Sequence, residues 1–278
     1  MSPRRALLVL LLAMALLELG TRATRIADTP LYLADNRIGY IPRPNQSGRF
    51  LWTHDWSFNE LSMGTSRPFR PAPSSILLIG DSIVFGGNPY TANERLGPQL
   101  AAVTGRDVWP IGAGSWSLQN ELQYLIDNPR VTSGVDQVVL VANSEDFAGP
   151  SSWANEITHP KSRHWSAAWQ ALQRYVFRPE TPKASLHLQV PLADPSKQTQ
   201  LVLRRLRRPL IVVVYPTLRE AVTRSSCAFQ PPAPLRHQSV RLLCINTAKG
   251  WRSDYYRDDI HPTVEGYGRL ARIIAASL

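Results

Sequence analysis

The stretch of residues 75–86 constrains the fold of this chain more than any other part of the sequence. It begins as a continuous apolar run, residues 76–79, which Gly80 closes. A run that is apolar at every position, rather than at alternate ones, is typical of a strand buried on both faces of a parallel sheet. Asp81 and Ser82 then follow at the turn toward a helix, which is where open α/β sheets build their ligand sites.

The serine in this turn is open to two interpretations. The hydroxyl of Ser82 can be exposed as a nucleophile, with the following N–H groups facing a developing negative charge. Alternatively, the turn is an ordinary tight one, in which Asp81 or Ser82 caps the next helix.

A second polar motif, Asp258-Asp259-Ile260-His261-Pro262, stands just before the last amphipathic stretch of the chain. A serine hydroxyl becomes a good nucleophile when a base takes its proton, and histidine is the usual base. Histidine in turn needs a carboxylate that orients the ring, and Asp258 can reach His261 from the same short loop. Pro262 suits the first position of the following helix, where its missing N–H costs nothing.

These two motifs, Gly80-Asp81-Ser82 and Asp258-x-x-His261-Pro262, resemble the SGNH hydrolase superfamily, also called the GDSL esterases and lipases. Their order and their separation match that family over residues 74–278. The resemblance implies an α/β fold, a three-layer α/β/α sandwich around a five-stranded parallel, doubly wound sheet of the flavodoxin-like kind. It also implies Ser82 as nucleophile, His261 as base and Asp258 as the partner of the base, with no metal or organic cofactor.

The rest of the domain has the alternation that such a sheet requires. Apolar runs predict strands at residues 76–79, 108–111, 137–142, 210–215 and 240–245. Helical patterns lie between and after them, at residues 92–103, 118–126, 218–224 and 263–278. Strands that alternate with helices form parallel, doubly wound sheets.

The turn after the second strand is the first candidate source of a donor to the oxyanion. In the family this turn carries a glycine whose backbone N–H faces the oxyanion, and Ser115 takes that place here. Gly112 and Gly114 allow the loop backbone a wide range of conformations. A backbone N–H near Gly114 and Ser115 can therefore donate to the oxyanion together with the N–H of Ser82. The alternative is an ordinary glycine turn.

The turn after the third strand departs from the family pattern. The family has Gly-x-Asn-Asp there, but Glu145 stands where the asparagine is expected, and an ionised carboxylate has no hydrogen to donate. If the strand geometry continues to Glu145, Asn143 points to the same side. We therefore predict Asn143 as the side-chain donor. The alternative is that Asn143 bonds to local backbone at the end of the strand.

The N-terminal part of the chain predicts export. Arg4 and Arg5 precede an apolar run at residues 6–17, which makes residues 1–23 a signal peptide or an N-terminal membrane anchor that holds the chain through residues 6–19. The rest of the chain should then be periplasmic, or anchored in the inner membrane facing outward. Residues 24–73 are rich in turns and predict extended segments and hairpins packed on the domain.

Residues 148–208 form an insertion that is long for a connection between two strands. It contains a helical pattern at residues 165–176, followed by a polar stretch, broken by prolines, through residue 200. Its aromatic residues either line an acyl or sugar pocket or cover a small core of the insertion; they are Trp153, Trp165, Trp169 and Tyr175. His159 and His164 have no metal-ligand neighbours and are interpreted as surface residues.

Charge and cysteine content narrow the function further. The net charge is +10, but the arginines are scattered and no nucleic-acid-binding motif accompanies them, so nucleic acid is not a predicted partner. A weakly attracted anionic membrane surface or a solvated arginine-rich surface fits this charge better.

Cys227 and Cys244 are the only cysteines; in an exported chain they form either a disulfide or two buried free thiols.

Together these features predict a serine ester hydrolase that acts through an acyl-enzyme on Ser82. The resemblance implies acetyl or short acyl groups, on carbohydrate or lipid esters, as the substrates. Two alternatives stay open. The same site can pass the acyl group to a hydroxyl of a cell-envelope polysaccharide, as an O-acyltransferase, or the chain is a non-catalytic envelope binding module with a vestigial triad.

Overall fold

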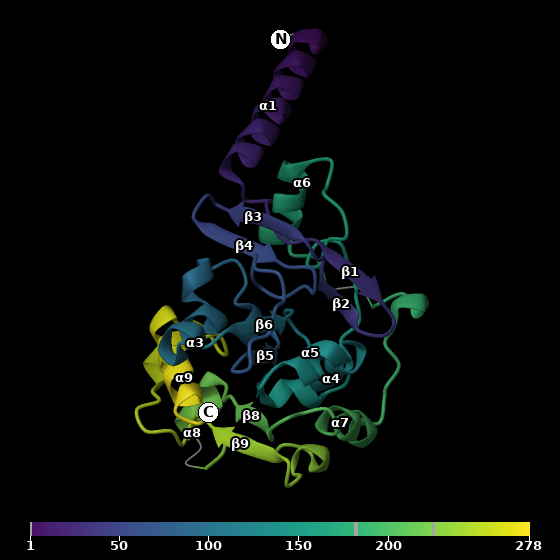
Figure 1. Ribbon diagram of the computed structural model, residues 1–278. Coiled ribbons are helices and arrows are strands. Elements are labelled where there is room, and N and C mark those ends of the chain that lie inside the picture. The colour runs from purple at the N-terminus through teal and green to yellow at the C-terminus, as the bar shows by residue number, and fades with distance from the viewer. Residues whose placement is uncertain (1, 181–182, 224–225) are drawn as a thin grey trace.

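A five-stranded parallel sheet forms the centre of the computed structural model, which describes residues 2–180, 183–223 and 226–278 (Figure 1). The strand order is β6-β5-β7-β8-β9, so the direction of winding reverses between β5 and β7. In such sheets the ligand site lies beyond the carboxyl ends of the strands at that switch point. The predicted α/β fold is confirmed, and the strand bounds are β5 (Ile76–Gly80), β6 (Val108–Gly112), β7 (Gln137–Ala142), β8 (Leu210–Val214) and β9 (Val240–Cys244).

Helices cover both faces of this sheet, which makes the three predicted layers. Successive strand side chains point to opposite faces, so Leu77 and Ile79 enter one core and Ile76 and Leu78 the other. The first core is completed by α4 (Leu118–Asp127), α5 (Pro129–Gly134) and α7 (Pro195–Leu203). The second is completed by α2 (Ser82–Phe85), α3 (Leu96–Thr104), α8 (Leu218–Thr223) and α9 (Val264–Ala275). Arg224, the predicted end of the helix before β9, lies outside the described residues.

Helix α7 corrects the sequence analysis, which predicted a polar, proline-broken stretch through residue 200. Pro195 starts this helix, where a missing N–H costs nothing. The carboxylate of Asp194 caps it by accepting the N–H groups of Ser196 at 2.9 Å and Lys197 at 3.3 Å. Val202 is fully buried in the first core, so α7 is a regular crossover helix and the extra residues of the insertion precede it.

The helical part of the insertion is shorter and less regular than predicted. It comprises α6 (Ala167–Ala171) and a turn of π-helix, η3 (Leu172–Phe177). Residues 181 and 182 of the insertion lie outside the described residues. The remaining short 3-10 turns of the chain are η1 (Ala92–Glu94), η2 (Ser144–Phe147), η4 (Leu186–Leu188), η5 (Ala233–Leu235) and η6 (Ser253–Tyr255).

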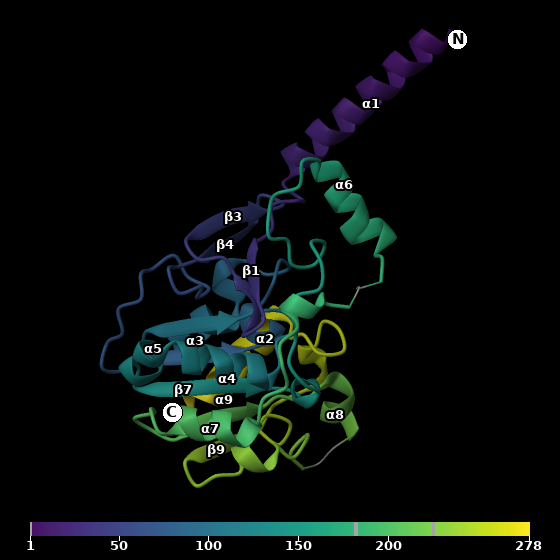
Figure 2. The same ribbon diagram turned by 90° about the vertical axis from the view of Figure 1, so that its right-hand side faces the viewer.

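The N-terminal part consists of one projecting helix and two hairpins. Helix α1 (Pro3–Thr24) projects from the body and has no buried residue (Figure 2). By length and composition it is the one helix in the described part of the chain that could cross a membrane. The hairpins are β1 (Tyr32–Asp35) with β2 (Gly39–Pro42), and β3 (Gln46–Phe50) with β4 (His54–Phe58). Tyr32 and Tyr40 of the first hairpin join the core on the α4 side of the sheet.

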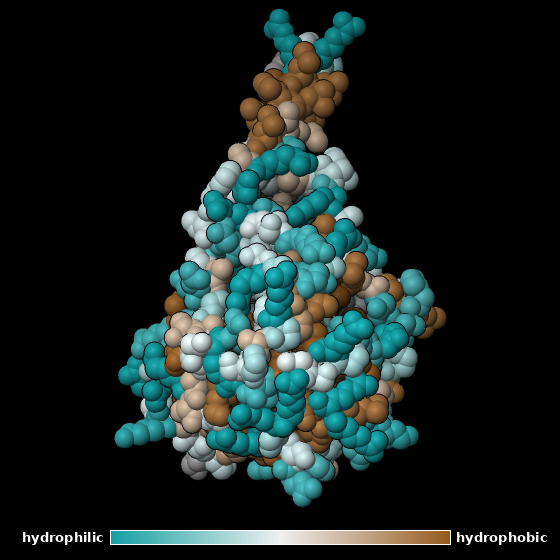
Figure 3. All heavy atoms as spheres, in the orientation of Figure 1, coloured by the Kyte–Doolittle hydropathy of each residue, from teal (hydrophilic) through white to brown (hydrophobic). Residues whose placement is uncertain are grey.

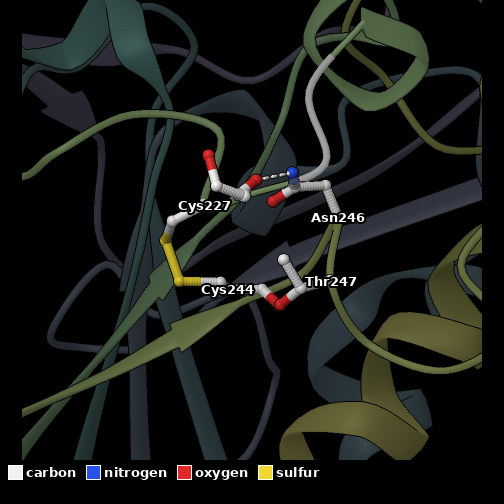
Figure 4. Close-up of a disulfide and its surroundings, with 5 residues drawn as sticks. Cys227, Cys244, Asn246 and Thr247 are labelled. Atoms are coloured by element: carbon white, nitrogen blue, oxygen red, sulfur yellow. Dashed lines mark hydrogen bonds between the residues drawn. A yellow bond between two sulfur atoms is a disulfide. The ribbon is translucent and has the colours of Figure 1, made fainter.

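Cys227 and Cys244 form a disulfide, as the first of the two sequence-based alternatives predicted (Figure 4). Their Cα atoms are 5.1 Å apart, and the bond joins the loop before β9 to the last residue of that strand. Beside it, the side chain of Asn246 donates to the carbonyl of Ser226, and Thr247 Oγ1 donates to the carbonyl of Cys244 at 3.1 Å. A persistent disulfide indicates an oxidising compartment.

Removal of this disulfide is expected to lower the free energy of unfolding. The two cysteines are 17 residues apart, and closing a loop of this length reduces the entropy of the unfolded chain by an amount worth about 3 kcal/mol. In urea titrations, the double variant Cys227→Ser/Cys244→Ser should therefore unfold at lower urea than the oxidised protein. Dithiothreitol should shift the wild type to the same midpoint and leave the double variant unchanged; a wild-type midpoint that ignores the reductant would contradict the prediction.

Candidate active site

Ser82 is the first residue of α2, and only Asp81 separates it from the carboxyl end of β5. Asp81 caps this helix, with Oδ1 accepting the N–H of Ile83 at 2.8 Å. The capping interpretation of this turn is confirmed for Asp81, and Ser82 Oγ donates to Asp81 Oδ2 at 3.3 Å. Gly80 makes the turn possible: a Cβ there would lie 2.6 Å from Val84 Cγ2 and 2.9 Å from the carbonyl oxygen of Val141.

The two distant motifs of the sequence meet at this turn. His261 Nε2 lies 3.0 Å from Ser82 Oγ, although the residues are 179 positions apart. On the other side of the ring, Nδ1 lies 2.9 Å and 3.0 Å from the two carboxylate oxygens of Asp258. The three side chains thus form a continuous hydrogen-bonded row from carboxylate to hydroxyl, which is the geometry that nucleophilic serine catalysis requires.

The carboxylate of Asp258 stays charged in this row. Partial burial by itself raises the pKa of Asp258, but the backbone N–H groups of His261 and Ile260 and the charge of His261 outweigh burial and lower that pKa to about 2. Those N–H groups donate to Oδ1 at 2.8 Å and 3.1 Å. An ionised Asp258 holds a hydrogen on Nδ1 and leaves Nε2 facing Ser82 as the acceptor.

The loop that carries the histidine is fixed by the protein around it. The N–H of Arg257 donates to the carbonyl of His261 at 2.8 Å, within an antiparallel bridge between Tyr256 and Pro262. The hydroxyl of Tyr215, at the end of β8, donates to the carbonyl of Ile260 at 2.9 Å. One detail of the prediction is wrong: α9 begins at Val264 with Thr263 as its N-cap, so Pro262 precedes the cap rather than opening the helix.

The predicted oxyanion loop lies next to Ser82 at the same edge of the sheet. Gly80 of β5 is paired with Gly112 of β6, so the turns that follow these two strands are neighbours. Within the described part of the chain, no acceptor binds the N–H of Gly114 or of Ser115. The space where a Cβ of Gly114 would lie is open to at least 4 Å. Two unpaired N–H groups beside an opening are suited to receive a developing negative charge.

The N-terminal hairpin and the insertion brace this loop from behind. Tyr40 of β2 donates its hydroxyl to the carbonyl of Gly114 at 2.7 Å and accepts the indole N–H of Trp116 on its own carbonyl at 2.7 Å. From the insertion, the hydroxyl of Ser151 donates to the carbonyl of Ser115. These contacts hold Ser115 at a φ of +62°, a left-handed conformation that costs a residue with a Cβ about 1 kcal/mol.

Asn143 does not have the geometry on which its predicted donor role rests. The strand ends at Ala142, and residues 144–147 form the 3-10 turn η2, so the expected strand geometry up to Glu145 is wrong. Asn143 instead caps that turn: Oδ1 accepts the N–H of Glu145 at 2.8 Å. Its Nδ2 donates to Asp81 Oδ2 and to Asp146 Oδ1, both at 3.1 Å, so both hydrogens of the amide have carboxylate acceptors.

A cluster of buried acids, which the sequence analysis missed, lies beneath Ser82. Its members are Asp81, Glu121 and Asp146, all less than 5% exposed. Burial raises the pKa of each carboxyl group, and the charge of Asp81 raises the pKa values of Glu121 and Asp146 further. Neither oxygen of Glu121 has a hydrogen-bond partner among the described residues. An unpaired carboxyl group with no access to water is more stable in its protonated form.

One signal in the sequence pointed to this position. Glu121 lies three residues after Leu118 and four before Leu125, so it falls on the apolar stripe of its helix instead of the polar face. An acid on the buried stripe of a helix is rare outside functional or paired sites. Asp81 and Asp146 gave no such signal, because both lie in turns where a carboxylate cap is common.

The buried Glu121 should make the stability of the protein depend on pH. Because burial raises the folded-state pKa of Glu121 well above 4.5, the value of a free glutamate, the folded protein binds more protons at this group. The contribution of Glu121 to stability is therefore greatest below pH 4.5 and falls as the pH rises toward its folded-state pKa. Glu121→Gln, which stays neutral, should therefore be as stable as the wild type near pH 4 and about 1–3 kcal/mol more stable at pH 7.

Urea titrations at several pH values measure this difference. Glu145→Gln is the matched control, because Glu145 is an exposed carboxylate 24 positions along the same chain and should give no pH-dependent gain. A Glu121→Gln variant whose advantage is the same at pH 4 and pH 7 would contradict the assignment.

Two other predictions for the insertion are corrected. His159 is half-buried rather than a surface residue: its ring centroid lies 4.8 Å from that of Tyr32 and 4.0 Å from that of Tyr40. Burial, with the charge of Arg174, lowers the pKa of His159 to about 4, so it is neutral at pH 7. Among the described residues, no group of three or more His, Cys, Asp or Glu side chains is placed to hold a metal ion.

The aromatic residues of the insertion do not line one pocket. Trp153 packs against the first core with Lys161 over its ring, and Tyr175 lines an open cavity of about 530 Å³ beside Phe85 and Asn88. Trp165 and Trp169 lie elsewhere, at the base of α1, where they line a different cavity.

Comparison with known proteins places the fold among solved structures only. No protein-family model and no curated protein sequence matches the chain. A lipolytic protein of the G-D-S-L family from Desulfitobacterium hafniense is 11% identical, with a TM-score of 0.40 over 74% of this chain and 99% of that one. A member of the lipolytic G-D-S-L family from Veillonella parvula is 16% identical, with a TM-score of 0.42 over 74% and 97%.

A third similar structure is a carbohydrate esterase of family 2, with a carbohydrate-binding domain, from Corynascus thermopiles. It is 15% identical, with a TM-score of 0.42 over 77% of this chain and 68% of that one. Two of these three structures are thus G-D-S-L lipolytic proteins and the third is a carbohydrate esterase. Likenesses of this size carry no information about substrate or activity, which depend on the side chains of the site.

Proposed function

We propose that the chain is a carboxylic ester hydrolase of the SGNH type, with Ser82 as nucleophile, His261 as general base and Asp258 as the partner of the base. The observation that supports this proposal is the row of hydrogen bonds from Asp258 through His261 to Ser82. His261 Nδ1 lies 2.9 Å from Asp258 Oδ1, and His261 Nε2 lies 3.0 Å from Ser82 Oγ. Acyl transfer needs a nucleophile, a base and a carboxylate that orients the base, and the serine, histidine and aspartate side chains supply these groups. They lie at the switch point of a parallel sheet, where such folds bind their ligands.

In the first half of the reaction, Ser82 Oγ attacks the ester carbonyl while its proton moves to His261 Nε2. The carbonyl oxygen becomes an oxyanion, and we assign its donors to the N–H of Ser82 and to the loop of Gly114 and Ser115. The charge of Asp258 stabilises the imidazolium that forms on His261. Collapse of the tetrahedral species breaks the ester C–O bond, and His261 returns the proton to the leaving alcohol.

In the second half, water or another hydroxyl takes the place of that alcohol. His261 removes its proton, the oxygen attacks the acyl group on Ser82, and a second tetrahedral species forms. When it collapses, the C–O bond to Ser82 breaks and His261 returns the proton to Ser82 Oγ. Attack by water releases a carboxylic acid; attack by a sugar hydroxyl makes a new ester.

The substrates we propose are acetyl or short acyl esters of carbohydrate or lipid. The open space in front of Gly114 leaves room for the acyl group of an ester, because, apart from its chain neighbours, no described atom lies within 4 Å of its Cβ position. The disulfide and the N-terminal apolar helix support a location outside the cytoplasm, where such esters decorate envelope polymers.

Labelling with a fluorophosphonate probe tests the proposal directly. The probe reacts with an activated serine, so the wild type should be labelled, and Ser82→Ala and His261→Ala should not. Absence of labelling in a folded wild-type protein would favour the alternative of a non-catalytic binding module. If enzyme that has not been treated with the probe releases p-nitrophenol from p-nitrophenyl acetate faster as a sugar acceptor is added, and acetylated sugar appears in place of acetate, the O-acyltransferase is the correct form of the same chemistry.

A further inference from the structure

The carboxylate of Glu18 links the end of α1 to the insertion. Its oxygens accept the hydroxyl of Ser166 at 2.8 Å and the backbone N–H groups of Ala167 at 2.9 Å and Ala168 at 3.0 Å. These are the first amides of α6, which have no acceptor within their own helix. Glu18 is therefore the cap of a helix that lies about 150 residues later in the chain.

Arg22 strengthens this link. Its guanidinium pairs with Glu18 at 2.6 Å and donates to the carbonyl of Trp165 at 2.8 Å. Together the two charged side chains satisfy the backbone on both sides of Ser166. A leader peptide that is cut away after export would have no reason to complete the fold of the body in this way.

The β3–β4 turn holds the same end of α1 from another side. The indole N–H of Trp52 donates to the carbonyl of Ala23 at 2.6 Å, and the guanidinium of Arg25 lies 4.1 Å from the centre of the Trp52 ring. In both ribbon views, α6 and the β3–β4 hairpin lie at the base of α1 (Figures 1 and 2). The helix is thus fixed to the body at two places.

Exposed apolar side chains gather around this base. Trp165 is 84% exposed, Phe177 59% and Trp52 53%, and the ring of Phe177 lies 5.9 Å from that of Trp169. We call the set the collar: Leu51, Trp52, Trp165, Trp169 and Phe177. An open cavity of about 510 Å³ lies between α1 and α6, lined by Met14, Leu17, Trp165, Trp169 and Leu172. Figure 3 shows α1 as a hydrophobic column above a mostly hydrophilic body, with hydrophilic side chains at its free end.

We propose that α1 is retained as a membrane anchor and that the collar lies in the interfacial layer of the lipid bilayer. Tryptophan prefers this layer, because its ring is apolar and its N–H is polar. The apolar run of residues 6–17 is about 18 Å long at 1.5 Å per residue, shorter than the roughly 30 Å hydrocarbon core. The mismatch draws the base of α1, and the collar with it, against the membrane surface.

The length of the apolar run by itself also fits a removable signal peptide, but the contacts of Glu18 do not. Cleavage after Ala23 would remove Glu18 and Arg22 and leave the first amides of α6 without acceptors. Arg4 and Arg5 at the free end of α1 keep that end in the cytoplasm, so the body faces outward. The lipid of the outer leaflet then fills the cavity between α1 and α6. This proposal is independent of the chemistry of Ser82.

The first test is the N-terminus of the exported full-length chain. Intact-mass analysis of protein from the membrane fraction, after washing with alkaline carbonate, should find α1 still attached. A mature protein that starts near Thr24 and washes off with carbonate would overturn the proposal. Fluorophosphonate labelling of the same samples reports separately on the proposed hydrolase function.

The second test locates the collar in the bilayer. Helix α1 contains no tryptophan, so quenching of tryptophan fluorescence by lipids brominated near the headgroup reports only on the body of the reconstituted protein. The double variant Trp165→Phe/Trp169→Phe should lose at least half of the wild-type quenching, whereas Trp153→Phe, from the same insertion, should keep it. Equal quenching in all three proteins, or none in any, would overturn the position of the collar.

The third test addresses Glu18. Hydrogen exchange of the Ala167 and Ala168 amides should be at least tenfold faster in Glu18→Ala than in the wild type, because their acceptor is gone. Leu19→Ala, which alters an exposed neighbour in α1, should leave that exchange unchanged. Unchanged exchange in Glu18→Ala would overturn the link between α1 and the insertion.

Discussion

Replacing Ser82 by alanine is expected to lower the turnover of p-nitrophenyl acetate by roughly three orders of magnitude or more. Without the hydroxyl no acyl-enzyme forms, and the oxyanion donors alone support only slow attack by water. His261→Ala should have an effect of similar size, because it removes the imidazole that lies 3.0 Å from the Ser82 hydroxyl and takes its proton. The double variant should be little worse than either single one, because the two groups act as a unit.

Asp259→Asn is the matched control for these variants. It removes a carboxylate next to Asp258, in the same loop, that makes no side-chain contact with His261 in the described part of the chain. Its turnover should stay within a few-fold of the wild type, and the thermal midpoints of all variants should be similar. A purified, folded Ser82→Ala that turns the ester over at the wild-type rate would show that the nucleophile lies elsewhere.

The parts of the fold that the sequence predicted are those in which local pattern and burial agree. Strands β5, β6, β7 and β8 are buried at every position because both faces of the sheet are covered there, and their largely apolar runs are visible without a structure. Ser82 and His261 were found for a different reason: each lies in a short motif whose chemistry is incomplete without the other. The pairing of two such motifs is informative even across 179 positions.

The parts that the sequence did not predict depend on distant partners. Helix α7 was missed because Pro195 and its polar neighbours gave no apolar run, although Asp194 and Pro195 are themselves a helix start. The role of Glu18 depends on amides about 150 residues away, which no local pattern reveals. The geometry assumed for Asn143 was wrong because strand geometry was continued to Glu145, whereas the strand ends at Ala142 and the chain then turns into η2, where side chains no longer alternate between two faces.

Asn143→Ala is the second change from which we expect a large effect, on stability as well as turnover. The Asn143 amide now stands between Asp81 and Asp146, donating to each at 3.1 Å, and its backbone N–H donates to Asp146 Oδ2 at 2.8 Å. Its loss leaves two buried carboxyl groups close together without the donor that separates them. Each such loss costs about 1–3 kcal/mol, so the free energy of unfolding should fall by about 2–5 kcal/mol.

The pH dependence of this loss separates the cap from the oxyanion donor that the sequence suggested. Burial raises the folded-state pKa values of Asp81 and Asp146 above 3.8, the ordinary value of an aspartate, so the contribution of these two groups to stability is greatest when they are protonated and weakens as the pH rises. Without the amide of Asn143, ionisation of Asp81 and Asp146 in the folded protein costs more free energy. The stability deficit of Asn143→Ala should therefore be smallest near pH 4 and should grow toward pH 8.

Turnover should fall together with stability, because Asp81 caps the turn that presents Ser82 and also lies 3.3 Å from its hydroxyl. Urea titrations at pH 4, 6 and 8, with ester turnover measured on the same samples, follow both quantities. Glu145→Gln changes an exposed carboxylate two residues away and should alter neither. A stable Asn143→Ala protein with a pH-independent midpoint and a turnover lower by two to three orders of magnitude would instead identify Asn143 as the oxyanion donor, since the loss of one such donor has an effect of about that size.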